Sequence, residues 1–210
     1  MSSASLALTL VNQSSDTNNS TVLIFQKSTL AGLGETAVAW HVIQNLGRGW
    51  THPFVYEFGL QVGTSDSYGN SSPLLLAAPG QLFSDFKNSS GDQIKLDGDM
   101  PNNTSDIWVQ NDLGIGAADA CVYRSGKLLA KKTGVVPGQA AAFQFNASIY
   151  IGVISQWDVK PGQLLNSGIL STVNSQVSLA GLSGSANIVM SGGGPGPSAV
   201  SFKFDLIPTG

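Results

Sequence analysis

The chain has 210 residues, of which only 11% are charged, and its formal net charge is −3. Ten Lys and Arg residues spread over this length exclude the long basic patch that nucleic-acid binding requires. No apolar run approaches the roughly 18 residues of a membrane-spanning helix, and a single cysteine excludes an intramolecular disulfide framework. Neutral polar residues must therefore provide solubility, which leaves little charge repulsion against self-association.

The first predicted element lies in "MSSASLALTLVNQSSD", where Ala4, Leu6, Leu8 and Leu10 alternate with small or polar residues. This period of two predicts a half-buried strand. The stretch lacks a positively charged start and a long apolar centre, so it does not read as a secretory signal. We expect a protein that is cytoplasmic or exported without a conventional signal peptide.

The next elements are strands in "TVLIFQK" and "AVAWHVIQ", a glycine-rich turn in "NLGRGW", and an alternating strand from Phe54 to Val62. Both histidines of the chain, His41 and His52, lie here with Glu57. Two histidines and one carboxylate form the triad that binds non-haem iron. The alternative, which we favour, is one histidine within a strand and one at a strand entry, each with local hydrogen bonds.

A candidate binding loop follows in "VGTSDSYGNSS", residues 62–72, which mixes Tyr68 and Asn70 with many small hydrogen-bonding residues. Adaptable recognition loops favour this mixture. Trp50, Trp108 and Trp157 also lie in or near turn-rich stretches, where exposed aromatic rings stack on sugars or lie at a membrane interface. These five residues are the candidate ligand-binding set, and core packing is the alternative for the aromatic ones.

A dense group of oxygen ligands occurs in "KLDGDMPNNTSD", which contains Asp97, Asp99 and Asp106. Oxygen ligands of this kind suit Ca²⁺. The spacing differs from that of an EF-hand, and Asp, Asn, Gly and Pro are also the residues of ordinary turns. We therefore favour a plain turn over a calcium site, and we expect no other cofactor.

Three Pro-Gly-Gln elements, at Pro79, Pro137 and Pro161, predict type II turns that each lead into an apolar run. "VYRSGKLL" predicts a hairpin with Ser125 and Gly126 at its tip. The succession of "VYRSGKLL" and "PGQAAAF" is similar to the cadence of many immunoglobulin-like β-sandwiches. This resemblance covers about 25 residues, concerns an architecture, and implies no function.

The last third of the chain contains one ambiguous segment, "GQLLNSGILSTVNSQVSLAG". Its apolar residues have helical spacing, but its Ser, Thr and Asn content disfavours a helix, so we predict a strand. "SGGGPGPS", residues 191–198, is a loop between two strands, the second of which alternates Val200, Phe202, Phe204 and Leu206 with polar residues.

Together these patterns predict an all-β, mainly antiparallel β-sandwich, immunoglobulin-like or jelly-roll-like, with about a dozen short strands and little helix. No clear linker divides the chain, so residues 1–210 are expected to form a single domain. A sub-boundary, if there is one, is expected near residues 156–165.

The leading functional hypothesis is a non-catalytic structural protein that self-associates, or packs against another protein, in a filament, a shell or as a surface component. Its motive is the low charge together with two strands, residues 4–11 and 148–155, that carry no charged residue and would be unguarded at a sheet edge. The alternatives are a module that binds a carbohydrate or lipid surface through loop aromatics, and a small metal-dependent enzyme using His41, His52 and Glu57.

Overall fold

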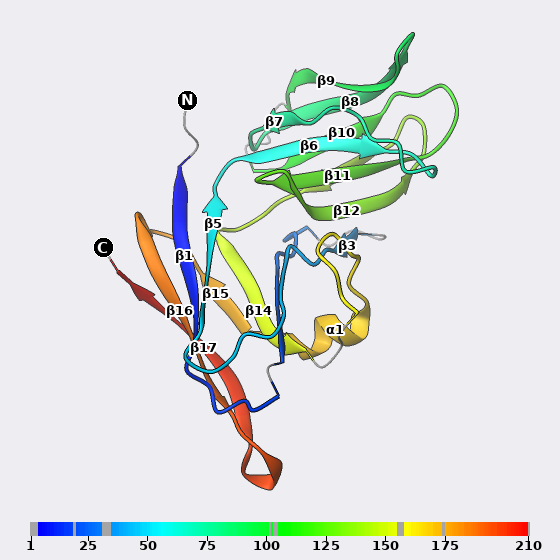
Figure 1. Cartoon of the computed structure of the whole chain (residues 1–210). Helices are drawn as coiled ribbons and strands as arrows, with labels where there is room; N and C mark the ends of the chain where they lie inside the picture. The colour runs from blue at the N-terminus through cyan, green and yellow to red at the C-terminus, as the bar shows by residue number, and fades with distance from the viewer. Residues whose placement is uncertain are drawn as a thin grey trace. The chain divides into compact units, whose positions relative to one another are not determined.

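The computed structural model of the protein describes residues 4–18, 20–30, 35–100, 102, 105–154, 158–173 and 175–209. These residues form strands β1 to β17 in four small sheets, which are mostly antiparallel, and one short α-helix, α1 (Figure 1). The predicted all-β class with little helix is thereby confirmed. The described part of the chain contains no helix long and apolar enough to cross a membrane.

Residue contacts divide the chain into two compact units, where the sequence led us to expect one domain. Unit 1 comprises Met1–Gln26, Val38–Phe58 and Ala147–Gly210, and unit 2 comprises Lys27–Ala37 and Gly59–Asn146. Unit 2 thus interrupts unit 1, and the sub-boundary considered near residues 156–165 falls inside unit 1. Each unit is assembled from separate segments of the chain, so a boundary between the units does not appear as a single linker in the sequence.

Unit 1 contains two four-stranded sheets with the orders β17-β16-β1-β5 and β15-β14-β2-β4. Its elements are β1 (Ser5–Asn12), β2 (Thr21–Phe25), β4 (His41–Ile43), β5 (Thr51–Glu57), β14 (Ser148–Ile154), α1 (Ser167–Thr172), β15 (Ser175–Ser178), β16 (Ser185–Gly193), a 3₁₀ turn at Gly196–Ser198, and β17 (Val200–Pro208).

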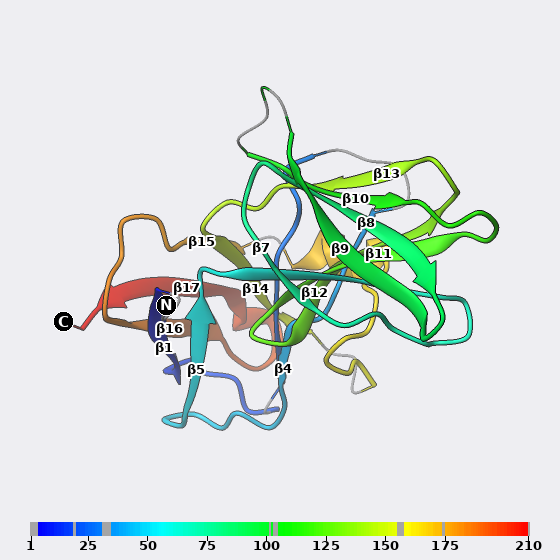
Figure 2. The same cartoon turned by 90° about the horizontal axis from the view of Figure 1, so that it is seen from above.

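Unit 2 contains a four-stranded sheet of order β13-β10-β8-β9, which can be followed in Figure 2, and a five-stranded sheet of order β3-β12-β11-β6-β7. Its strands are β3 (Glu35–Ala37), β6 (Leu60–Ser65), β7 (Leu75–Ala77), β8 (Gln81–Asn88), β9 (Gly91–Asp99), β10 (Ile107–Asn111), β11 (Ala118–Arg124), β12 (Lys127–Val135) and β13 (Ala140–Phe143).

The two units share one topology. The strands correspond in chain order: β6 to β9 of unit 2 match β14 to β17 of unit 1, and β10 to β13 match β1, β2, β4 and β5. With these replacements the sheet orders of unit 2 become those of unit 1, apart from the extra edge strand β3. Strand directions agree as well, because β8 and β10 are parallel, β16 and β1 are parallel, and all other paired strands are antiparallel. The chain therefore has two similar halves, residues 5–99 and 107–208, and, apart from β3, each unit takes four strands from each half.

This equivalence extends to individual hydrogen bonds at two buried asparagines, Asn12 at the end of β1 and Asn111 at the end of β10. Each side-chain amide donates to a main-chain carbonyl, and each main-chain N–H and C=O pairs with a turn whose glycine has positive φ. The bonds are Asn12 Nδ2 to Leu46 O (2.6 Å), Asn111 Nδ2 to Val135 O (2.7 Å), Asn12 N to Trp50 O (3.0 Å), Asn111 N to Gln139 O (2.9 Å), Gly49 N to Asn12 O (2.7 Å) and Gly138 N to Asn111 O (2.8 Å). Burial of polar groups that are fully paired fixes both strand ends.

The alternating pattern predicted for the first strand is confirmed in β1. Leu6, Leu8 and Leu10 are buried, while Ser5 and Ala7 are exposed. The single strand predicted from Phe54 to Val62 is wrong, because β5 ends at Glu57 and β6 begins at Leu60. In β5, Phe54 and Tyr56 are buried and Val55 is half exposed. Trp40, which is 1% exposed, packs its ring edge-on against those of Phe54 and Tyr56, with centroids 6.2 and 6.0 Å apart. This aromatic cluster is part of the core of unit 1.

The prediction that two uncharged strands lie at sheet edges is wrong. β1 is hydrogen-bonded on one side to β16 and on the other to β5, and β14 lies between β2 and β15. Central strands have no free backbone groups, so they need none of the charged residues that protect an edge. The absence of charge in both segments reflects their central position.

The strand predicted across residues 162–181 is correct only at its end. The chain forms helix α1 first, and β15 follows. Asn166 caps the helix by accepting a 2.9 Å hydrogen bond from the Ile169 N–H, and Ile169 is buried. A capped, half-buried turn outweighs the weak helix propensity of Ser and Thr.

The three Pro-Gly-Gln turns are confirmed. Gly80, Gly138 and Gly162 have φ of 88°, 78° and 84°, and each following glutamine N–H donates to the carbonyl three residues before it. In two of the turns the glutamine side chain adds a second bond, from Ala78 N to Gln81 Oε1 and from Lys160 N to Gln163 Oε1, both at 2.9 Å. This closure explains why glutamine follows the glycine. The hairpin at Ser125 and Gly126 is also confirmed, with positive φ at both residues.

Two described tryptophans of unit 1, Trp40 and Trp50, differ in burial and provide a matched test of this core. We predict that Trp40→Ala lowers the free energy of unfolding by about 3–5 kcal/mol, because it removes a fully buried ring. Trp50→Ala should change the free energy of unfolding by less than about 0.5 kcal/mol, because Trp50 is 67% exposed. Urea unfolding followed by circular dichroism measures both, and equal losses would show that the Trp40 cluster is not a core.

Candidate functional site

Unit 2 contains a pocket of about 660 Å³ at the end where three of its loops meet. The loops are the β6–β7 connection, the β8–β9 hairpin and the β10–β11 connection. The lining is mainly polar, with serines from each of the first two loops, and it includes four charged residues: Asp66, Asp85, Lys87 and Asp92. Two side chains that are almost fully exposed, Tyr68 at 90% and Ile115 at 93%, also line it.

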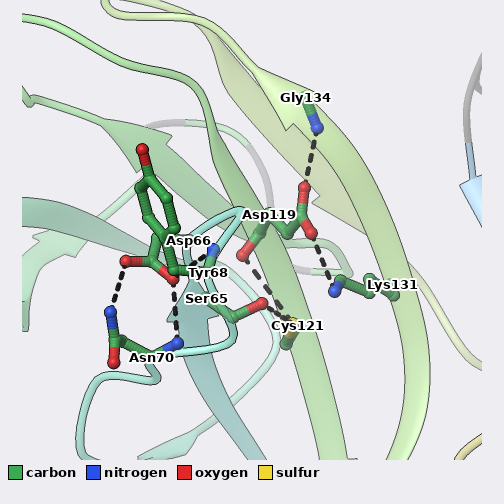
Figure 3. A network of polar contacts seen from close by, with 8 residues as sticks. All are labelled: Ser65, Asp66, Tyr68, Asn70, Asp119, Cys121, Lys131 and Gly134. Atoms are coloured by element: carbon green, nitrogen blue, oxygen red, sulfur yellow. Dashed lines mark hydrogen bonds and ion pairs between the residues drawn. The ribbon is translucent and has the colours of Figure 1, made fainter.

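Asp66 holds the β6–β7 loop in shape, as Figure 3 shows. Its carboxylate accepts hydrogen bonds from the N–H of Tyr68 (2.9 Å), the N–H of Asn70 (2.8 Å) and the Asn70 side-chain amide (2.7 Å). These bonds, above all that from the Asn70 side chain, lower the pKa of Asp66. Tyr68 lies on the turn that these bonds close, and its ring is almost fully exposed. The hydrogen bonds to Asp66 therefore restrain the backbone from which the phenol ring projects.

Asp85 lies at the buried side of the pocket. It stands on β8 between Asn111 of β10 and Ile94 of β9, and it is 1% exposed. It is hydrogen-bonded to the Thr64 side chain of the other sheet, but its Oδ1 has no hydrogen-bond partner among the described residues. Burial, and to a smaller extent the charge of Asp92, raise the pKa of Asp85 to about 6. A buried carboxylate with an unused acceptor requires an explanation.

The equivalent positions of unit 1 are apolar. Asn111 is in register with Asp85, and its counterpart Asn12 is in register with Met190, which is also 1% exposed. Gly63 and Gly152 occupy matching positions, because a Cβ added to either would lie 2.8 Å from a side chain that precedes the next strand. Thr64 follows Gly63, and Val153 follows Gly152, so these two residues also correspond. The polar pair Asp85 and Thr64 thus replaces Met190 and Val153. The shared fold does not require this polarity, which points to a local role in unit 2.

Cys121 lies near the loop but is not part of the pocket lining. It is buried, its Sγ lies 3.7 Å from the Ser65 hydroxyl, and it donates to the Asp119 carbonyl at 3.7 Å (Figure 3). Burial raises the pKa of its thiol, which makes it a poor nucleophile. The Asp119 carboxylate binds Lys131 Nζ (2.7 Å) and Gly134 N (2.9 Å), so this network joins β11 to β12.

The structure does not bring His41, His52 and Glu57 together. His52 and Glu57 are five positions apart on β5, so they lie on opposite faces and roughly 16 Å apart along the strand. His41 is on β4 in the other sheet, with its ring 4.3 Å from that of Trp40 and 5.1 Å from that of Phe54. In the described part of the chain, no three His, Cys, Asp or Glu side chains are placed to hold a metal ion. The structure therefore gives the iron-triad hypothesis no shared site among these three residues.

Asp97, Asp99 and Asp106 likewise form no such group, and each has a local role. The Asp97 carboxylate is bound by the Ser84 hydroxyl and, at 2.9 Å, by Lys95 Nζ, and these contacts lower its pKa. Asp99 ends β9, where it is in register with Gln81. The Asp106 carbonyl accepts the Gly80 N–H at 2.7 Å, and its carboxylate accepts the Ser105 hydroxyl at 2.9 Å. Asp97 and Asp99 thus lie on strand β9, where we expected a turn, and Asp106 directly precedes β10.

Of the five candidate ligand-binding residues, only Tyr68 and Asn70 line the pocket. Trp50 is in unit 1, and Trp157 lies outside the described residues. Trp108 is on β10 of unit 2, but on the strand face opposite to Asn111, and its buried indole N–H has no partner among the described residues. Sequence reasoning missed Asp85, although one signal was present: in "LFSDF" an acid shares the strand face of Phe83.

Comparison of the chain with protein-family models, with curated proteins and with solved structures finds no match.

The raised pKa of Asp85 has a consequence for stability. Its folded pKa of about 6 exceeds the ordinary value of 3.8, so the folded state binds the proton more tightly than the unfolded state. The free energy of unfolding should therefore fall by roughly 3 kcal/mol as pH rises from about 4 to above 6. We predict that Asp85→Asn removes this fall and is more stable than the wild type at pH 8, with little difference at pH 4.

Urea unfolding at pH 4, 6 and 8 measures the effect. Asp99→Asn, an equal change of charge at an exposed position of β9, is the matched control and should keep the wild-type pH profile. A wild-type profile in Asp85→Asn would show that Asp85 is ionised as easily in the folded state as in the unfolded state.

Proposed function

We propose that the protein is a non-catalytic β-sandwich binding module, and that the unit 2 pocket binds a small carbohydrate. The observation that supports this most directly is the buried Asp85 with an unused acceptor at a pocket lined by hydroxyl, amide and carboxylate groups. A sandwich is inferred because each unit consists of two sheets with apolar inner residues; in unit 2, Val62 on one sheet and Phe83 on the other are both fully buried.

A sugar suits this lining in three ways. Its hydroxyl groups both donate and accept, which matches serine hydroxyls, Asn70, Gln93 and the carboxylates. An exposed aromatic ring such as that of Tyr68 offers a flat apolar face for the C–H side of a sugar ring. The volume lies within the range of about 300–1,000 Å³ that small-ligand pockets have. The predominance of polar groups makes a lipid surface a poorer fit.

The test of this proposal is carbohydrate binding by variants of Tyr68. We predict that Tyr68→Ala weakens binding of the sugar that the wild type binds best by about tenfold, because the stacking face is lost, whereas Tyr68→Phe keeps most of the affinity. A set of neutral mono- and disaccharides is measured by isothermal titration calorimetry or by ligand-observed NMR.

Trp50→Ala in unit 1 removes an exposed aromatic ring outside the pocket and should leave affinity unchanged. Absence of binding across the whole set, or equal effects of the Tyr68 and Trp50 variants, would contradict the proposal. Release of cleaved sugar during the same incubations would contradict its non-catalytic part.

Self-association is the second candidate, and it now rests on other strands than the sequence suggested. Two edge strands of unit 2, β7 (Leu75–Ala77) and β13 (Ala140–Phe143), carry no charged residue. Leu76 on β7 is 80% exposed. An edge with free backbone groups and an exposed apolar side chain permits strand addition between subunits. On this proposal the protein forms a filament, shell or surface layer of identical subunits.

We predict that Leu76→Lys reduces assembly, because it places a charge at an otherwise unguarded edge. Light scattering and negative-stain imaging measure particle mass and shape. Leu96→Lys is the matched control, since Leu96 is also exposed but lies on the edge strand β9 beside Lys95 and Asp97, and it should assemble like the wild type. A wild-type chain that stays monomeric at high concentration would rule out this second function.

A further inference from the structure

We propose that the ligand of the unit 2 pocket carries a positively charged nitrogen beside its hydroxyl groups, as an amino sugar does, and that Asp85 is the residue that selects it. This inference rests on the proposed carbohydrate-binding function and narrows the class of ligand. Three observations support it: the missing cationic partner of Asp85, the other charged residues of the pocket, and the apolar residues at the equivalent positions of unit 1.

Asp85 lacks a cation. Neither the Lys95–Asp97 nor the Lys131–Asp119 ion pair includes Asp85. Its side chain reaches Thr64, while its buried Oδ1 stays without a hydrogen bond in the described part of the chain. An ionised carboxylate can only accept, and a buried charge without a partner is costly. A ligand ammonium group would supply both the donor and the opposite charge once the Asp85 side chain, which is 1% exposed, turns toward the pocket that it lines.

The other charged residues lining the pocket do not supply that partner. Asp66 is occupied by three N–H groups of its own loop. Lys87 is exposed and is in register with Asp92 across the β8–β9 hairpin, so its nearest cross-strand neighbour is that acid. Three carboxylates and one ammonium line the pocket. This excess of negative charge favours a cationic ligand over a neutral one and disfavours an anionic one.

Unit 1 shows that the fold does not need this acid. Met190 occupies the position of Asp85, and Val153 that of Thr64, in a unit with the same strand order. Met190 is buried and Val153 is half-buried, and apolar side chains are the less costly choice at such positions of a sheet. The polar pair in unit 2 is therefore best explained by a contact with something that enters the pocket.

The experiment compares sugars that differ at one position. Binding of glucose, glucosamine, N-acetylglucosamine and glucuronate to the full chain is measured by isothermal titration calorimetry at pH 7. We expect glucosamine to bind at least tenfold more tightly than glucose, N-acetylglucosamine to bind no better than glucose, and glucuronate to bind most weakly. Asp85→Asn, which keeps the shape of the side chain, should abolish the preference for glucosamine over glucose.

Asp99→Asn is the control, since it changes the net charge equally at an exposed site outside the pocket lining, and it should keep the preference. Circular dichroism checks that both variants are folded. Equal affinities for glucose and glucosamine in the wild type would overturn the charge selection and leave the proposed sugar binding intact. A preference that survives in Asp85→Asn would overturn the role of Asp85. Binding of none of the four sugars would overturn both the inference and the proposed function.

Discussion

Each of the four sheets depends on a central pairing between the two halves of the chain. These pairings are β1 with β16, β2 with β14, β6 with β11, and β8 with β10. The remaining pairs lie within a half, except that the short edge strand β3 joins β12 across the halves. Neither unit can therefore bury its core from one half alone. A domain-swapped dimer whose two chains had been joined end to end would have this arrangement.

The same constraint creates the pocket. The β8–β10 pairing places Asp85 beside Asn111, and the β6–β11 pairing sets Thr64 opposite Ala120. Both pairings bring the ends of strands from different halves to one end of unit 2, where three loops meet. The strands are fixed by ladders of hydrogen bonds to their neighbours, while most residues of the three loops are exposed. Ligand sites commonly have this division between a rigid scaffold and variable loops.

The comparison of the two units separates what the fold needs from what one unit adds. Paired features, such as Asn12 with Asn111 and Gly152 with Gly63, recur because they close strand ends or admit a neighbouring side chain. Asp85, in contrast, has the apolar counterpart Met190. An acid at such a position lowers stability above its pKa, and proteins commonly accept this kind of loss at functional sites. Unit 2 thus differs from unit 1 by a buried acid that the common scaffold does not require.

The amino-acid sequence by itself determined the local features of this protein, because these depend on neighbours along the chain. Period-two alternation predicted β1 and β5, proline and glycine predicted the three Pro-Gly-Gln turns, and the composition of residues 62–72 identified the loop that carries Tyr68. Tertiary structure alone decided which strands are central, how two interleaved units form, and that His52 and Glu57 lie apart while Asp85 and Tyr68 line one pocket. These outcomes depend on pairings between residues far apart in the chain, such as Asn12 with Met190, and periodicity carries no information about them.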